Sequence, residues 1–301
     1  MTPRLWPEGP GPTAAALDAA AALLAAGPVA VLTGAGCSTE SGIPDYRGEG
    51  TARRARSPVR FATFVRDPAA RRRYWARAVV GWPRIAHARP NPAHHALAGL
   101  EASGRLSGLL TQNVDRLHHA AGSARVIELH GALHEVRCLE CGVREGRAAL
   151  QARLLAMNPG LAAHAAGAAE YNPDGDAELP EALVEAFHVA TCLTCGGDLK
   201  PDVVFFGETV PRPRVEEAYR CVDEAAALLV AGSSLAVLSG LRFVRHAAAR
   251  GVPVVVLNQG ETRGDPLATV KLPGRLGEVL PALAARLGVN ASCAPASSSP
   301  P

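Results

Sequence analysis

The sequence predicts an α/β fold in which a Rossmann-like parallel sheet carries helices on both faces and a small zinc-binding module is inserted. Two observations lead to this fold class. Short apolar runs alternate with helical stretches along most of the chain, and the one segment that interrupts the alternation contains two C-x-x-C pairs. We therefore expect a Rossmann-like domain in residues 1–132 and 199–289, a zinc-binding module in 133–198 and a disordered tail in 290–301.

The expected elements follow from the pattern along the chain. A helix over 13–26 ends at Gly27-Pro28 and leads into the apolar run 29–33 (VAVLT), which is typical of a buried parallel strand. Further strands are expected at 109–111, 126–129, 203–206, 228–231 and 253–257, and further helices at 215–227 and 241–250. Residues 48–67 lack a clear period and are expected to be irregular.

The composition is that of a globular protein. Of the 301 residues, 48% are hydrophobic and 20% are charged, which excludes a disordered or collagen-like chain. The net charge of +3 and the aromatic content of 4% argue against a partner that is nucleic acid or membrane. The basic residues are arginines except for Lys200 and Lys271, a usage typical of a GC-rich, bacterial genome. Without an apolar span or a charged leader segment, the protein is expected in the cytoplasm.

Four of the seven cysteines form two pairs, Cys138/Cys141 and Cys192/Cys195. In a reducing compartment this spacing indicates metal binding rather than disulfides. Four thiolates predict one tetrahedral zinc ion with a structural role, because no coordination position stays open for a substrate. A zinc ribbon that binds nucleic acid is the alternative, and the acidic residues near the pairs, Glu135, Glu140 and Glu145, disfavour it.

A glycine-rich motif, Gly34 to Ser41, follows the first expected strand and opens a helix-like stretch. Glycines let a backbone approach a pyrophosphate, and a helix N-terminus favours the anion, so the motif indicates a dinucleotide site. The acidic residue that holds the adenosine ribose in Rossmann dehydrogenases is missing about 20 residues further on. The motif therefore suggests a dinucleotide but not hydride transfer.

Seven further motifs follow in order: GIPDYR (42–47), TQNVDRLH (111–118), ELHG (128–131), the two C-x-x-C pairs, KPDVVFFGE (200–208), GSSL (232–235) and LN (257–258). This ordered set resembles the sirtuin family of NAD-dependent protein deacylases over about residues 13–286. Within that family, the sequence is most similar to the class II branch, which includes the mitochondrial lipoamidase type. The similar segments are TESGIPDYR (39–47), RYWAR (73–77), PNPAH (90–94) and the long insertion between the cysteine pairs.

The resemblance implies a reaction in which an acyl-lysine oxygen attacks the NAD ribose, nicotinamide leaves, and a base then takes a proton from a ribose hydroxyl. The products would be nicotinamide, free lysine and O-acyl-ADP-ribose. The implied catalytic residues are His130, the base, and Asn113; a histidine suits a base because its pKa lies near working pH. The implied NAD contacts are Gly34, Ala35, Gly36, Ser38, Asp45, Tyr46, Arg47, Gln112, Asn113, Val114, Asp115, Gly232, Ser233, Ser234, Asn258, Gln259, Gly260 and Leu276. Val204 and Phe206 would line the acyl-lysine tunnel.

Several alternatives stay open. The same NAD site would serve mono-ADP-ribosyl transfer to a protein, or a non-catalytic module that senses NAD. Asp45 is a pocket contact or a loop cap, and Cys37, Cys221 and Cys293 are expected to have no role in the reaction. The arginines between Arg53 and Arg77 form a solvated surface or attract anionic groups. Residues 48–56 lack the tyrosine–arginine pair found in succinyl-preferring sirtuins, so we expect a preference for neutral acyl groups.

Overall fold

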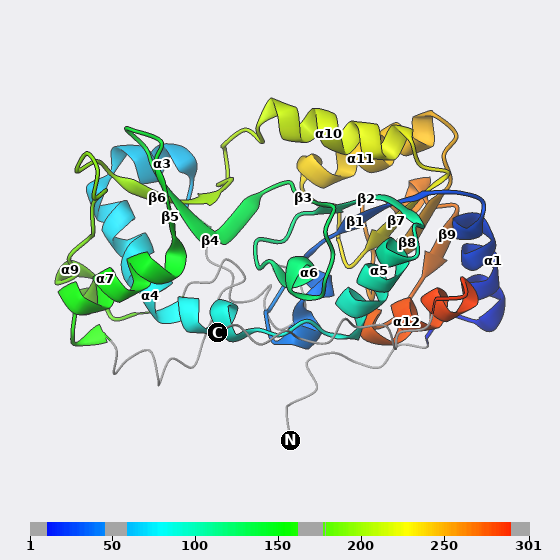
Figure 1. The fold of residues 1–301 in the computed structure, drawn as a ribbon, viewed down its shortest axis with the longest axis horizontal. Helices are drawn as coiled ribbons and strands as arrows, with labels where there is room; N and C mark the ends of the chain where they lie inside the picture. Colours follow the sequence, from blue (N-terminus) through cyan, green and yellow to red (C-terminus); the bar gives the residue numbers. More distant parts are fainter. Residues whose placement is uncertain (1–10, 46–58, 162–176, 178, 290–301) are drawn as a thin grey trace, which may run out of the picture.

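The computed structural model describes residues 11–45, 59–161, 177 and 179–289, which form a large and a small lobe side by side (Figure 1). The expected tail 290–301 and two of the expected NAD contacts, Tyr46 and Arg47, lie outside the described residues. Among the described helices, none combines the length and the apolar character that a membrane span requires.

The large lobe is built on a six-stranded sheet with the strand order β3-β2-β1-β7-β8-β9, in which every neighbouring pair is parallel. The strands are β1 (Val29–Thr33), β2 (Leu106–Thr111), β3 (Val126–Glu128), β7 (Ala227–Ala231), β8 (Val254–Leu257) and β9 (Val270–Leu272). All residues of β1, β2, β7 and β8 are buried, as expected of parallel strands covered on both faces. The predicted α/β class is confirmed, whereas β9 was not expected because Val270–Leu272 is a short run with a central lysine.

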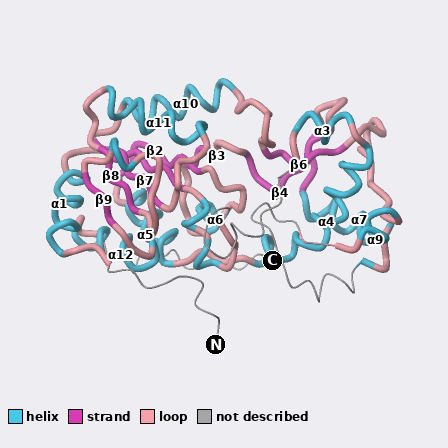
Figure 2. Tube along the Cα trace, turned by 180° about the vertical axis from the view of Figure 1, so that it is seen from behind, coloured by secondary structure: helices cyan, strands magenta, loops and turns pink. Residues whose placement is uncertain are grey.

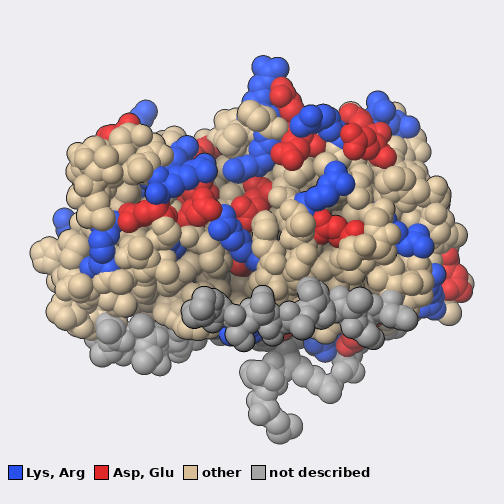
Figure 3. All heavy atoms as spheres, in the orientation of Figure 1, with Lys and Arg blue, Asp and Glu red and all other residues tan. Residues whose placement is uncertain are grey.

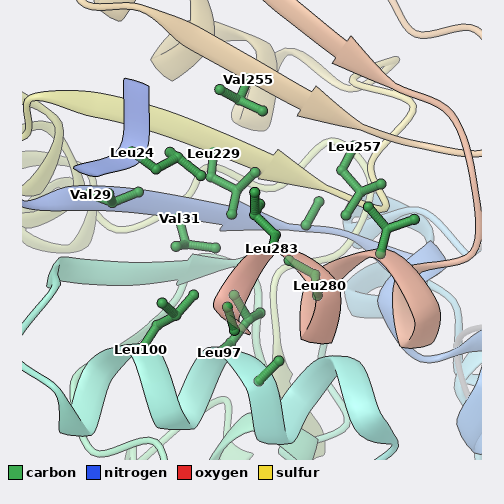
Figure 4. Packing of buried hydrophobic residues seen from close by; sticks show 14 of the residues in the cluster. Leu24, Val29, Val31, Leu97, Leu100, Leu229, Val255, Leu257, Leu280 and Leu283 are labelled. Carbon is green, nitrogen blue, oxygen red and sulfur yellow. The ribbon is translucent and has the colours of Figure 1, made fainter. Parts of the chain in front are cut away.

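Helices cover both faces of this sheet. On one face lie α1 (Ala14–Ala25), α5 (Pro92–Ala102) and α12 (Leu276–Arg286), and on the other lie α10 (Arg212–Asp223) and α11 (Leu238–Ala249). Figure 4 shows leucines of α5 and α12 packed against the central strands, among them Leu97, Leu100, Leu280 and Leu283. The sheet is thus buried between two helix layers, and the ends of its strands lie at the margin of this core.

The small lobe has its own antiparallel sheet in the order β5-β4-β6, and Figure 2 shows its strands as a group apart from the large sheet. Its elements are α3 (Phe61–Arg66), α4 (Pro68–His87), β4 (Gly131–Cys138), β5 (Arg144–Gly146), α7 (Arg147–Met157), α9 (Glu181–Glu185) and β6 (Leu199–Val203). The expected strand 203–206 is therefore wrong. The strand covers Leu199–Val203, and it pairs with β4 rather than with the Rossmann-like sheet.

The packing of α3 and α4 differs from the division expected from the sequence, which placed them in the Rossmann-like domain. Phe64, Tyr74 and Trp75 are buried in one core with Val136 and Leu150 of the inserted segment. The Tyr74 ring contacts the rings of Trp75 and Phe64 edge to face, at centroid separations of 5.3 and 5.4 Å. The aromatic side chains of α3 and α4 add buried apolar surface to the core of the inserted segment.

The face of the molecule shown in Figure 3 carries Lys and Arg side chains interspersed with Asp and Glu side chains. Ion pairs between described residues include Arg116 with Glu128 and Glu135, and Arg144 with Asp202. This pattern agrees with the small net charge of the chain.

Candidate functional site

The motifs found in the sequence meet at one edge of the large sheet. Because neighbouring strands are parallel, the carboxyl ends of β1, β2, β3, β7 and β8 all lie at this edge, where an open α/β sheet binds its ligands. The motif residues follow these ends within two residues: Gly34 after β1, Gln112 after β2, His130 after β3, Gly232 after β7 and Asn258 after β8.

The glycine-rich motif packs directly against the turn after β7. The amide of Gly36 donates to the carbonyl of Gly232 at 2.8 Å, and a Cβ atom at Gly34 would lie 2.7 Å from the Cβ of Ser233. Gly232 has a φ of 67°, and a Cβ there would lie 2.5 Å from the amide nitrogen of Cys37. Glycine is therefore required at these positions so that the two turns can touch.

The helix expected to open at this motif is replaced by two short 3₁₀ turns, Ala35–Cys37 and Thr39–Ser41. Glu40 in the second turn accepts a hydrogen bond from the amide of Gly277 at 2.7 Å and pairs with Arg275 at 3.0 Å. This carboxylate links the turn to the start of α12 and satisfies one of the free amides there. The sequence analysis missed Glu40, since its partner lies 237 residues away.

A buried polar cluster joins the ends of β1 and β2. The Ser38 hydroxyl donates to Asp115 Oδ2 at 2.6 Å and accepts from Asn113 Nδ2 at 3.0 Å, while Asp115 Oδ1 accepts from the amide of Leu117 at 2.9 Å. All three side chains are at least nine-tenths buried. Burial raises the pKa of Asp115, and the hydrogen bonds from Ser38 and Leu117 oppose that effect.

Gln112 connects this cluster to the second turn. Its Oε1 accepts from the Ser233 hydroxyl at 2.7 Å, and a Cβ at Gly240 would lie 2.7 Å from its Nε2. The carbonyl of Val114 accepts from the amide of Leu133 and so ties the end of β2 to β4 of the small lobe.

His130 lies where the two lobes meet. Its Nδ1 is 2.9 Å from the carbonyl oxygen of Gln112, and its Nε2 is 2.9 Å from the hydroxyl of Ser239, a residue that the sequence analysis missed. A carbonyl only accepts, so Nδ1 carries the ring proton and Nε2 keeps its lone pair. Burial lowers the pKa of His130, the hydrogen bond to the Gln112 carbonyl partly opposes that effect, and the nearby charge of Arg214 adds to it. The net shift is downward, which favours the neutral ring at pH 7.

Gly131 fixes the place of this histidine. Its φ is +76°, and a Cβ there would lie 2.0 Å from the carbonyl oxygen of Asp202, so no other residue fits. The carbonyl of His130 itself accepts from the amide of Val204 at 2.8 Å. The glycine of the ELHG motif thus lets the chain after β3 pass directly against β6.

The two residues expected to line the acyl-lysine tunnel lie just beyond β6. Val204 is half-buried beside His130, whereas Phe206 is 46% exposed. The carbonyl of Phe206 accepts from the amide of Phe61 at 3.0 Å. The buried Lys200 ammonium pairs with Glu208 at 2.9 Å, and Glu208 also accepts from the amide of Phe205, so both ends of this segment are tied down.

On the other side of the edge, the segment after β8 is open to solvent. Asn258 Nδ2 donates to the carbonyl of Gly260 at 3.0 Å, and Gln259 and Gly260 are exposed. Leu276 is buried, and its Cδ2 would lie 2.8 Å from a Cβ atom at Gly232. Asp45, at the end of the described stretch, is half-buried.

The four paired cysteines come together in the small lobe. The Cys138 and Cys195 sulfurs are 3.5 Å apart, and those of Cys141 and Cys192 are 3.7 Å apart. Four sulfurs around a tetrahedral zinc ion lie about 3.8 Å from one another at Zn–S distances of about 2.3 Å, so the donor set fits this metal. The two turns are built alike, as CLECG (138–142) and CLTCG (192–196), and each ends in a glycine with positive φ.

A second buried group, Cys37, His94 and His118, lies beneath the glycine-rich turn, with potential ligand atoms within 4.8 Å of one another. The amide of Asn91 donates to His94 Nδ1 at 3.3 Å, so the proton of the neutral ring is on Nε2, the atom 3.9 Å from the Cys37 sulfur. A metal ligand normally donates from its second ring nitrogen, and here that nitrogen accepts. His94, as it is hydrogen-bonded here, therefore does not fit a metal ligand.

Comparisons with known proteins agree with this arrangement. A family model described as the Sir2 family matches residues 34–239. NAD-dependent protein deacetylase 1 of Streptomyces coelicolor is 52% identical over 295 residues, which are 96% of this chain and 97% of that protein. The human mitochondrial NAD-dependent protein lipoamidase sirtuin-4 is 52% identical over 254 residues, covering 83% of this chain and 80% of that protein.

Solved structures show the same fold. A structure described as Sir2 with a p53 peptide and NAD+ is 30% identical, with a TM-score of 0.72, and the match covers 89% of this chain and 97% of that one. The match to the family model and the identity to these relatives show that the chain belongs to the Sir2 family.

Proposed function

We propose that this chain is an NAD-dependent protein deacylase that removes acyl groups from lysine side chains, with His130 as its general base. The observation that carries this assignment is the state of His130: a neutral ring at the sheet edge whose Nε2 keeps its lone pair. The activities printed for the relatives, deacetylation and lipoamide removal, support the same reaction class.

The residues at the sheet edge suit NAD. The touching turns at Gly34–Gly36 and Gly232–Ser234 lie after β1 and β7, where a pyrophosphate would bind, and Leu276 lies beside them, where the adenine would bind. The buried cluster of Ser38, Asn113 and Asp115 offers donors and acceptors for the nicotinamide ribose and its carboxamide. When bound, NAD supplies the ribosyl group that accepts the acyl oxygen, with nicotinamide as the leaving group.

His130 acts as the general base by accepting a proton from the ribose hydroxyl at Nε2. The hydrogen bond from Nδ1–H to the Gln112 carbonyl fixes the tautomer and the ring plane, and it stabilises the positive ring that forms once the proton has arrived. The zinc ion would be held by Cys138, Cys141, Cys192 and Cys195, and its role is structural.

His130→Ala tests the assignment. We expect product formation to fall by about 10²- to 10⁴-fold, the usual contribution of a general base, while calorimetry still detects NAD binding. His188→Ala is the matched control, since His188 is an exposed histidine of the small lobe. Mass spectrometry of an acylated protein substrate reads the reaction: loss of the acyl mass supports deacylation, and gain of ADP-ribose supports transferase activity instead.

We propose further that neutral acyl groups are preferred over succinyl. Val204 and Phe206 are apolar, and a carboxylate buried beside them without a cationic partner would be costly. Residues 48–56, where succinyl-preferring sirtuins carry their tyrosine–arginine pair, lie outside the described residues. Matched acetyl, lipoyl and succinyl peptides decide the question by their kcat/KM, and a succinyl peptide that exceeds both neutral peptides contradicts the proposal.

A further inference from the structure

Ser239 is the one side chain hydrogen-bonded to the reactive nitrogen of His130 among the residues that the structure describes. It is the second residue of α11, and its hydroxyl lies 2.9 Å from Nε2. Because Nδ1 donates to the Gln112 carbonyl, Nε2 has no proton to give, so the hydroxyl of Ser239 donates and Nε2 accepts. The lone pair that has to receive the substrate proton is thus already aligned with a donor.

The start of α11 is held in place by the same residue that holds His130. Gly240 follows Ser239, and the close approach of its Cα to the Gln112 side chain leaves no room for a Cβ. The carbonyl of Gln112 accepts from His130, and its side chain accepts from Ser233. Gln112 therefore fixes the distance between the histidine ring and the helix that carries Ser239.

We propose that Ser239 is a positioning residue for the general base: it holds the His130 ring with Nε2 deprotonated and aimed at the substrate. The two hydrogen bonds, one at each nitrogen, prevent rotation about the Cβ–Cγ bond, which would exchange the two nitrogens. When the ribose hydroxyl arrives, it replaces the Ser239 hydroxyl as the donor to Nε2, so one hydrogen bond is exchanged for another and the lone pair is never unpaired. This inference rests on the proposed function, since it assigns a role within that reaction.

The test compares Ser239→Ala, which removes the hydroxyl, with Ser239→Thr, which keeps it. We expect Ser239→Ala to lower kcat/KM for NAD by about 3- to 10-fold, as follows from the loss of one hydrogen bond in the free enzyme. The kcat should stay within about 2-fold of wild type, because in the substrate complex the ribose hydroxyl has already taken the place of Ser239. Ser239→Thr should recover most of this loss. Ser103→Ala is the matched control, because its hydroxyl donates to the Leu100 carbonyl at the end of α5.

A double-variant cycle distinguishes positioning from an independent effect. In the His130→Ala background, Ser239→Ala should cause no further loss of the residual product formation, because its partner is gone. A further loss of 3-fold or more in that background, or a kcat/KM for NAD of the single variant less than 2-fold below wild type, overturns the proposal. Wild-type protein without NAD-dependent nicotinamide release from any acyl peptide would instead overturn the proposed function, so the two failures are distinguishable.

Discussion

The buried ring of His94 should make the protein sensitive to mild acid. The side chain is fully buried against His118, with ring centroids 4.8 Å apart, and burial, reinforced by the charge of His95, lowers its pKa from 6.5 to about 4. In the unfolded chain the ring takes up a proton near pH 6.5, whereas the folded protein resists protonation down to about pH 4. The unfolded state therefore binds more protons within this window, and the free energy of unfolding falls as the pH decreases from 6.5 to 4.

The size of the effect follows from the shift. A pKa difference of about 2.5 units at about 1.4 kcal/mol per unit gives a loss of about 3 kcal/mol from His94 alone. Above pH 6.5 both states carry a neutral ring, and the contribution to the pH dependence vanishes. His118, whose pKa is also lowered by burial, adds a loss of the same sign.

Urea unfolding followed by circular dichroism at several pH values between 7.5 and about 4 measures the effect. The comparison is wild type against His94→Gln, which cannot titrate and offers an oxygen to the Asn91 amide that now donates to Nδ1. The variant is less stable at pH 7, and the gap to wild type should narrow by about 3 kcal/mol towards pH 4. Acid release of zinc affects both proteins alike and cancels in the difference. If the two stability curves run parallel from pH 7.5 to 4, the burial argument for His94 is wrong.

Three further predictions concern other parts of the site. Lys200→Met should lower the free energy of unfolding by about 3–5 kcal/mol in urea titrations, because the Glu208 carboxylate stays buried without its partner. Adding Glu208→Gln should recover part of the loss. If the destabilisations of the two single variants simply add in the double variant, the pairing is contradicted. Gly131→Ala should abolish deacylation or prevent folding, as expression and activity assays will show, since its Cβ would overlap the Asp202 carbonyl; a fully active variant would exclude the close approach. Cys195→Ser should reduce the zinc content and the melting temperature, measured by metal analysis and calorimetry, and a metal-free variant as stable as wild type would refute a structural zinc ion.

The sequence by itself determined the sheet and the edge at which the site lies. A short apolar run followed by a polar motif can be recognised from the local sequence alone. Because the strands pair in parallel, the carboxyl ends of all of them, with the motifs that follow, lie at the same edge of the sheet. The pattern predicted the glycine-rich turn at Gly34 for this reason, and the resemblance to sirtuins implied Gln112, His130 and Gly232. The structure places all four within two residues of the end of a strand. The four cysteines were also predictable, since metal coordination imposes its own spacing on each pair.

The tertiary structure alone decided how these residues are held. Ser239 contacts His130 across 109 residues, and Glu40 contacts Gly277 across 237 residues, and nothing in either local sequence distinguishes these side chains from solvent-exposed ones. The aromatic residues of α3 and α4 joined the small lobe rather than the Rossmann-like domain for a related reason. A hydrophobic pattern predicts that one face of a helix is buried, but it does not identify the element that covers this face. That element depends on the shape and volume of the whole folded chain.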